Sequence, residues 1–420
     1  AAAARRRVVI TGMGVACPLG LDVNTLYTNL LEGKTAIRQM TAEDHPDIEK
    51  LNVRIAAPMY TGFPEKELIQ EMGPLAAPVY AFSYYSALKA VEDSGWNAAK
   101  EADLSRIATT FGSGVGPITR INNAYATAVN EGYDKVDPYM GISASIGQGA
   151  NFVSKKFGIT GPSYSIGTAC TTGQVVIGEG MRMIQRGEAD LAICSSTENG
   201  TIPLSLVSFH KIGALSDSTR DPKTISRPFD EERNGFVGGD GAGAVVVEEL
   251  EHALRRGAKI YAEVLGNSLT SDAFHFTRPL EDGTGAKRCL IEAIEEAGIT
   301  PDQVDLYYAH ATSTKEGDMI EAMNIYSVFG APGPNITSMK GNIGHLLSSA
   351  GIVQTIAAVM ATKHNRIPHI YNTVNPLKVY GKNLNFVMRE PKNTTVNYAL
   401  CSAFGFGGTN STLIIGKYRE

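Results

Sequence analysis

Hydrophobic residues recur along the chain with two periods, one typical of buried strands and one typical of helices. Short apolar runs rich in β-branched residues predict strands at residues 8–11, 107–111, 191–194, 244–247, 260–265, 306–309 and 412–415. Helical spacing separates these runs, and the clearest apolar stripe consists of Leu290, Ala293, Ile294 and Ala297. This alternation predicts an α/β fold built of layers around mostly buried strands.

Two similar segments indicate that the chain repeats itself. A strand-like run ending at Cys170 leads into a predicted helix over residues 171–186, and TSMKGNIGH leads into a predicted helix over residues 345–363. Comparable strands open near Val8 and near Ile260, on either side of a charged segment at residues 248–257. We therefore predict two duplicated halves, residues 1–255 and 256–420, with insertions in the first half at residues 51–81 and 112–149.

Composition supports two halves and excludes several classes of protein. The 420 residues exceed the roughly 250–300 that one hydrophobic core serves. A net charge of −5 is no electrostatic footprint for nucleic acid. Five cysteines without a C-x-x-C pair exclude a disulfide framework and a thiolate metal site.

Targeting signals are weak in this sequence. No apolar run approaches the roughly 18 residues that span a bilayer. The opening AAAARRR lacks the apolar segment of a secretory signal, and either a tag remnant or the end of a removed transit peptide accounts for it. We expect a cytoplasmic protein, with a mitochondrial or plastid matrix as the alternative.

Familiar nucleotide and hydrolase motifs are absent or incomplete. GMG at residues 12–14 resembles a dinucleotide fingerprint, but Cys17 occupies the position of its third glycine, so we interpret it as a tight turn. The sequence contains no P-loop, no G-x-S-x-G and no H-E-x-x-H, which excludes the commonest nucleoside triphosphatases, serine hydrolases and zincins.

The strongest candidate for chemistry is Cys170, within SIGTACTTG. A cysteine at the start of a helix feels the positive end of the helix dipole, which favours the nucleophilic thiolate. Its own backbone N–H can donate to an oxyanion. The alternative is a buried core cysteine, which we expect for Cys17, Cys194, Cys289 and Cys401.

Two histidines and a glycine-rich loop supply candidate partners for this cysteine. His310 ends the predicted strand in DLYYAH, and His345 begins a predicted helix with Lys340 five residues before it. Strand ends and helix starts of this kind meet at one crevice of an α/β sheet. AFGFGGTN, residues 403–410, predicts either a flexible loop gated by Phe406 or an ordinary turn.

Together these segments resemble the elongating β-ketoacyl-[acyl-carrier-protein] synthases, a branch of the thiolase-like condensing enzymes. The resemblance covers nearly the whole chain and rests on RRVVITGMGVACPLG, GTACTTG, RPFDEERNGFVGGDGAGAVVVEE, HATSTKEGD, MKGNIGHLLSSAG and FGFGGTN. It implies a thiolase fold, in which duplicated five-stranded mixed sheets form an αβαβα arrangement. One cysteine with two histidines differs from the initiating synthases, which have Asn for one His, and from thiolases, which use a second cysteine.

The resemblance also implies roles for individual residues. Cys170 would accept the acyl chain, while His310 and His345 would hold the malonyl thioester and promote its decarboxylation. The remaining implied residues are Lys340, which keeps the site of the second histidine polarised; Glu321, a buried acid; Phe406, the gate, whose N–H completes an oxyanion hole with that of Cys170; Thr312 and Thr314, which bind the phosphopantetheine arm; and Val115, Tyr139 and Met140, near the acyl pocket.

The implied partners are acyl carrier protein, in its acyl and malonyl forms, and a second copy of the chain. No nucleic acid, membrane, metal or bound cofactor is implied, because phosphopantetheine arrives on the carrier protein. The carrier is acidic, so we expect a local basic patch, with candidates Lys66, Arg120, Lys135, His210 and Lys211.

Three alternatives remain open at this point. One is a ketosynthase of a dissociated polyketide pathway, the second is a non-catalytic chain-length-factor subunit, and the most distant is a thiol hydrolase. Retention of Cys170, His310 and His345 argues against the second, and a hydrolase would leave one histidine and Lys340 unexplained. Departures from the family pattern at Ala311, Lys315–Glu316 and Ser402–Ala403 leave chain length and pathway undecided.

Overall fold

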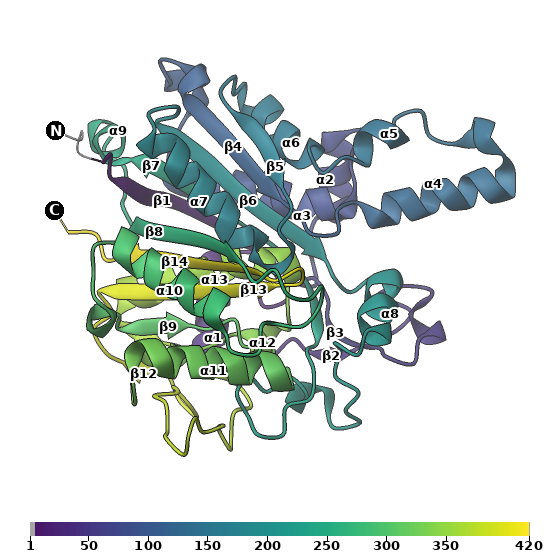
Figure 1. Cartoon of the computed structure of the whole chain (residues 1–420). Helices are drawn as coiled ribbons and strands as arrows, with labels where there is room; N and C mark the ends of the chain where they lie inside the picture. The colour runs from purple at the N-terminus through teal and green to yellow at the C-terminus, as the bar shows by residue number, and fades with distance from the viewer. Residues whose placement is uncertain (1–4, 420) are drawn as a thin grey trace.

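The computed structural model describes residues 5–419, so most of the AAAARRR segment lies outside it. Its main sheet has twelve strands, ten of them in the order β10-β9-β13-β14-β8-β1-β7-β6-β4-β5 (Figure 1). These strands are β1 Val8–Ala16, β4 Ile107–Gly112, β5 Ser163–Ile166, β6 Leu191–Asn199, β7 Gly238–Glu249, β8 Ala262–Ser271, β9 Leu306–Tyr308, β10 Asn335–Thr337, β13 Tyr398–Gly405 and β14 Thr409–Gly416. Short strands β2 Arg38–Gln39 and β3 Ile55–Ala57 join beside β7, and β11 Arg366–Ile367 pairs with β12 Lys392–Asn393.

The sheet consists of two five-stranded halves with the same topology. We number the five strands of each half in chain order. From the outer edge of the sheet to its centre, both halves then have the order third, second, fourth, fifth and first. The first strands of the halves, β1 and β8, pair antiparallel through Val9 with Glu263 and Ile10 with Ala262. The duplicated α/β fold is confirmed. The helix α9 Leu250–Arg255 lies between β7 and β8, and a boundary at residue 255 stays a prediction.

Strand residues in the first half alternate between two helical layers. Ile193 and Val246 pack with Ala87 and Ala90 of α3 Pro78–Ser94. The neighbouring Cys194 and Val245 belong instead to the core around α7 Thr172–Gln185. Side chains of a strand point alternately to its two faces, so α3 and α7 cover opposite faces of this half.

The second half repeats this alternation. Tyr307 and Leu400 pack with Leu290 of α10 Thr284–Glu296. Tyr308 and Cys401 belong to the central core, which also contains α13 Ala350–His364. The protein therefore has five layers. The helices α7 and α13 form the central layer, the two five-stranded halves of the sheet lie on either side of it, and α3 and α10 cover the outer faces. The other α-helices are α1 Val23–Leu31, α2 Glu65–Met72, α4 Ile118–Glu131, α5 Met140–Ser143, α6 Gln148–Phe157, α8 Pro203–Lys211, α11 Lys315–Phe329 and α12 Lys340–Ile343.

The central helices α7 and α13 touch backbone to backbone at their first turns. A Cβ on Gly173 would lie 2.5 Å from the backbone N of Ile352, and a Cβ on Gly351 would lie 3.0 Å from that of Gln174. Every residue of α13 from Ala350 to Thr362 is buried, as expected for a helix that is apolar on all sides. The crossing brings together the two segments that precede these helices.

The start of α13 differs from the sequence-based expectation. The predicted helix began at His345, whereas α13 begins at Ala350 and is preceded by the short helix α12. Gly344 (φ 68°) and Leu347 (φ 51°) adopt left-handed conformations, which interrupt the helix. His345 therefore lies in a turn between α12 and α13.

The two predicted insertions have different outcomes. Residues 112–149 form an arm, made largely of α4 and α5, that projects from the body of the molecule (Figure 1). The end of the 51–81 segment instead belongs to the core, because α3 begins at Pro78. Within residues 5–419, no helix combines the length and the hydropathy needed to cross a bilayer.

We expect Gly173→Ala to lower the free energy of unfolding by about 1–3 kcal/mol, because the added methyl group must push α13 away from α7. Chemical denaturation measures this change. Gly141→Ala is the matched control, since nothing lies within 4 Å of a Cβ at Gly141, and we expect a change below about 0.5 kcal/mol. Equal stability of the two variants would contradict the close crossing.

Candidate active site

Cys170 lies in a strained turn between β5 and α7. Ala169, immediately before it, has φ 51°, a left-handed conformation that costs free energy in a residue with a side chain. The Thr171 hydroxyl donates to the carbonyl of Thr168 (2.6 Å), and the Thr172 hydroxyl donates to that of Ala169 (2.7 Å). These bonds hold the turn, and the side chain of Cys170 stays buried.

His345 directly contacts this cysteine. Its Nε2 lies 3.2 Å from Sγ of Cys170. The backbone N–H of His345 donates to the carbonyl of Val237 at 2.7 Å, and the ring of Phe236 meets the imidazole edge-on with centroids 5.2 Å apart. Backbone and ring are thus fixed so that Nε2 faces the sulfur.

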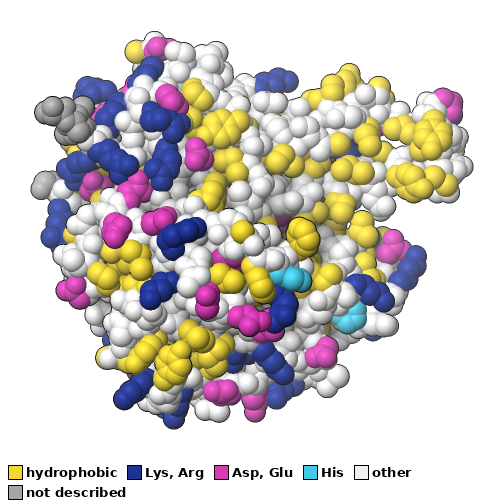
Figure 2. Space-filling view, viewed as in Figure 1, with side chains coloured by type: hydrophobic (Ala, Val, Ile, Leu, Met, Phe, Trp, Pro, Cys, Tyr) yellow, Lys and Arg dark blue, Asp and Glu magenta, His cyan; other side chains and the backbone are white. Residues whose placement is uncertain are grey.

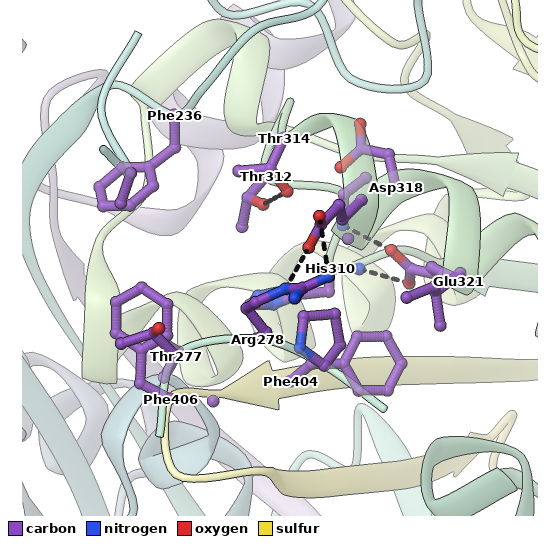
Figure 3. A pocket seen from close by; sticks show the side chains of 18 of the residues that line it. Phe236, Thr277, Arg278, His310, Thr312, Thr314, Asp318, Glu321, Phe404 and Phe406 are labelled. Atoms are coloured by element: carbon purple, nitrogen blue, oxygen red, sulfur yellow. Dashed lines mark hydrogen bonds and ion pairs between the residues drawn. The ribbon is translucent and has the colours of Figure 1, made fainter. Parts of the chain in front are cut away.

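His310 completes the group. Its ring is perpendicular to that of His345, with centroids 5.3 Å apart, and it packs against Phe404 at 5.6 Å. The backbone of this segment is held by Glu321 of α11, which accepts from the N–H of His310 (2.8 Å) and of Ala311 (2.7 Å) (Figure 3). The buried acid implied by the resemblance therefore positions a histidine through its backbone.

Lys340 reaches the same segment from the other side. Its Nζ donates to the backbone carbonyl of His310, and burial lowers the pKa of the amine to about 8, partly offset by Glu321. The charge of Lys340 also acts on the second histidine, as the resemblance implies, because it contributes to the lowered pKa of His345. Lys340 and Glu321 thus hold the backbone of the His310 segment, the first through its carbonyl and the second through its N–H groups.

Burial decides the protonation of the three reactive groups. It lowers the pKa of His310 and of His345 well below the ordinary range, so both imidazoles are neutral near pH 7. It raises the pKa of Cys170 to about 12, although Lys340 and two backbone N–H groups oppose the shift. Burial therefore opposes the thiolate that the helix start favours, and the thiolate stays a prediction for the reacting state. The resting group is a thiol with a neutral base 3.2 Å away.

Two backbone N–H groups converge on the sulfur. Those of Cys170 and Phe406 face Sγ and lower the pKa of the thiol. Phe406 lies in the turn between β13 and β14, and a Cβ on the preceding Gly405 would lie only 3.2 Å from the backbone N of Cys170. Two N–H donors at this place can form an oxyanion hole for the tetrahedral intermediate of a thioester bonded to this sulfur.

These groups lie on one cavity of about 450 Å³. Its lining includes Cys170, both histidines, Phe406 and the two threonines Thr312 and Thr314, whose hydroxyls lie 3.1 Å apart. Among residues 5–419, no group of three or more His, Cys, Asp or Glu side chains is arranged to hold a metal ion.

Three residues expected near the acyl pocket do not line this cavity. Tyr139 and Met140 lie at the start of α5 on the projecting arm. The backbone N–H of Val115 donates to the carboxylate of Glu198 (3.2 Å), and its side chain is partly exposed. These residues therefore do not line the cavity of their own chain, although a Cβ on Gly114, next to Val115, would lie 3.8 Å from the Cα of Ala169.

Sequence reasoning missed two buried acids. Glu198, at the end of β6, accepts from the N–H of Gly114 (2.8 Å) and the hydroxyl of Ser348 (2.7 Å), which ties the loop after β4 to the turn before α13. Asp318, on α11, accepts from the N–H of Ser313 (3.1 Å). A lone acid in the apolar stretch LAICSSTEN was the available signal for Glu198.

Comparison with known proteins places the chain in a family. Residues 5–253 match the beta-ketoacyl synthase N-terminal domain, and residues 261–374 match its C-terminal domain. The 3-oxoacyl-[acyl-carrier-protein] synthase 2 of Coxiella burnetii is 38% identical, and the match covers 98% of this chain and 99% of that protein.

Solved structures agree with this assignment. A beta-ketoacyl synthase from Burkholderia phymatum superimposes with a TM-score of 0.90 at 28% identity, covering 99% of this chain and 100% of that one. A type II polyketide ketosynthase, solved in complex with its acyl carrier protein, gives 0.89 at 26% identity, covering 99% and 100%. With the duplicated fold and the Cys170–His345–His310 group at its centre, the chain belongs to the beta-ketoacyl synthase family of condensing acyltransferases.

Proposed function

We propose that this chain is a 3-oxoacyl-[acyl-carrier-protein] synthase of fatty acid elongation, which joins malonyl-carrier protein to an acyl chain held on Cys170. The observation that carries the proposal is the contact between the Cys170 thiol and His345, with a second neutral histidine beside it. The curated relatives with this name are 35–38% identical over nearly the full chain, which favours fatty acid over polyketide synthesis.

The first half-reaction is acyl transfer. Sγ of Cys170 attacks the carbonyl of the incoming thioester while its proton passes to Nε2 of His345, 3.2 Å away. The N–H groups of Cys170 and Phe406 stabilise the oxyanion. The carrier thiolate leaves, takes the proton from His345 and departs as a thiol, so the imidazole is neutral again for the next step.

The second half-reaction makes the carbon–carbon bond. His345 next adopts the tautomer that carries its proton on Nε2, so that both histidines can donate. The carbonyl oxygen of the malonyl thioester then accepts hydrogen bonds from His310 and His345, and the bond to the carboxylate breaks with loss of CO₂. The electron pair becomes an enolate, which attacks the acyl carbonyl on Cys170 and expels the Cys170 thiolate. The thiolate takes up a proton from solvent, which restores the resting thiol. Two neutral imidazoles suit this step, because they donate to the oxygen without protonating the enolate outright. The chemistry needs no metal or resident cofactor.

Carrier protein would deliver both substrates at the cavity mouth. Of the candidate basic residues, His210 and Lys211 end α8 next to Ile212, which lines the cavity. Arg120 instead pairs with Asp137 on the arm, and Lys135 pairs with Asp134. The α8 end is therefore the docking position that we favour for an acidic carrier, in a cytoplasm or organelle matrix.

A second copy of the chain would cover two exposed features. β5 is the outer strand of its half and is half exposed, and unpaired edge strands are ready to pair with another chain. The neighbouring arm carries exposed apolar side chains (Figure 2), namely Ile121, Tyr125, Val129, Tyr133, Tyr139 and Ile142. Apolar surface of this kind marks an interface. In such a homodimer Tyr139 and Met140 would lie at the interface rather than in the cavity of their own chain.

A mass measurement tests the acyl-transfer step. After incubation with acyl-carrier proteins of several chain lengths, we expect one acyl group on the peptide that contains Cys170, because this thiol alone has a base and two N–H donors. Cys194→Ala, which removes another buried thiol, should load normally. Absence of the adduct from wild type, or its presence on Cys170→Ala, would refute the assignment.

Cys170→Gln separates the two half-reactions. Decarboxylation uses the imidazole donors and not the sulfur, so this variant should still release CO₂ from malonyl-carrier protein while condensation is lost. His310→Ala should lose both activities, by at least about 10²-fold. Radiolabelled CO₂ release and product chromatography measure them separately. Loss of decarboxylation in Cys170→Gln would contradict the division of labour.

The pH dependence of kcat reports on Lys340. The amine is charged below its pKa of about 8 and neutral above it. Raising the pH through 8 therefore removes the positive charge beside the His310 carbonyl, and kcat should fall. No acid limb is expected near pH 6.5, because the pKa values of both histidines are lower. Initial rates between pH 5.5 and 9.5 test this. Lys340→Met should have a low kcat at every pH and should lack the fall at alkaline pH. A wild-type kcat that stays constant up to pH 9.5 would contradict the prediction.

A further inference from the structure

Arg278 occupies the mouth of the catalytic cavity. It lies on the loop between β8 and α10 and lines the same cavity as Cys170, but its side chain is 49% exposed. Figure 3 shows the guanidinium reaching across toward a carboxylate of α11. The loop is fixed to the Phe406 turn, because the N–H of Gly407 donates to the carbonyl of Phe276 (2.7 Å). The cavity thus runs from a buried thiol to an accessible cation.

The partner of Arg278 is Glu316 in the first turn of α11. Nε of Arg278 lies 3.3 Å from Oε2 of Glu316, and Nη2 lies 3.3 Å from Oε1, a two-pronged arrangement. Glu281 adds a longer contact at 3.4 Å. Both side chains of the main pair are about half exposed. Such pairs contribute little stability, so another anion can replace Glu316 at small cost.

The chemistry of the substrate arm supplies such an anion. A carrier-bound thioester has its reactive carbonyl at one end and a phosphodiester at the other, joined by amides. When the carbonyl is at Cys170, the charged phosphodiester must remain at the open end, because burying it unpaired is costly. Arg278 and Lys315 are the two cations of the cavity lining. Arginine matches phosphate with two parallel N–H donors, whereas lysine offers a point charge.

We propose that Arg278 binds the phosphodiester of the substrate arm, and that Glu316 is its resting counter-ion, displaced when the arm enters. This rests on the proposed function, since it assigns a binding residue for the same substrates. The site then selects phosphopantetheine thioesters over otherwise identical thioesters without phosphate. Glu316 lowers the affinity of the mouth for anions by competing for the same donors.

The decisive experiment compares thioesters of 4′-phosphopantetheine and of pantetheine, which differ only in the phosphate. For Arg278→Ala we expect KM to rise about tenfold with the phosphorylated substrate and less than twofold with the other. Glu316→Gln should lower KM for the phosphorylated substrate alone, because the competing charge is gone. Arg288→Ala is the matched control: Arg288 is also an exposed arginine paired with a glutamate, Glu292, but it does not line the cavity.

Equal changes for both substrates in Arg278→Ala would show that the residue only holds its loop, and no change in either would show that it is idle; each result overturns the proposal. Calorimetric binding of free 4′-phosphopantetheine and pantetheine to the wild type and Arg278→Ala gives a readout without turnover. If wild type condenses neither these thioesters nor the carrier-bound substrates, the proposed function fails, while loss of phosphate-dependent binding in Arg278→Ala would still support Arg278 as the anion ligand.

Discussion

The contact between the first turns of α7 and α13 is the constraint on which the active site depends. Gly173 and Gly351 have no side chains, so the two helices approach until backbone meets backbone. Each helix is preceded by one reactive segment, and the spacing of Cys170 and His345 follows from that approach. A methyl group at either glycine would be felt at the reacting atoms, although neither residue takes part in the chemistry.

Exclusion of water is the second determinant. In a solvated site, the helix start and Lys340 would favour a thiolate and the imidazoles would titrate near neutral pH. Within the central layer the cost of desolvating a charge outweighs these effects. Cys170 therefore rests as a thiol, and His310 and His345 rest as neutral imidazoles. At the same depth the side chains of Glu321 and Lys340 hydrogen-bond to the backbone N–H and carbonyl groups of the His310 segment. They fix the position of His310 and leave the transfer of protons to uncharged partners.

The sequence identified the residues of the site better than their arrangement. Strands such as β4 and β6 were predictable because both of their faces are buried, which leaves continuous apolar runs. β5 was predicted within a strand-like run ending at Cys170, but the strand itself ends at Ile166. β10 and β13 were not predicted, β13 because its last residues belong to the glycine-rich segment AFGFGGTN, which was interpreted as a loop or a turn. The motifs named Cys170, His310 and His345, but the start of α13 was misplaced because a left-handed Leu347 has no signature in sequence. Glu198, Asp318 and Arg278 act through partners distant in the chain, which periodicity does not reveal.

The matching strand orders of the halves imply a near-twofold relation, in which Cys170 follows the third strand of one half and His345 follows the third strand of the other. In a dimer of identical chains, every residue at such a position would occur twice, and a nucleophile would face a second nucleophile. Covalent fusion removes that identity. One position holds a thiol and its counterpart an imidazole, so the central axis carries an acid–base pair that strict symmetry forbids.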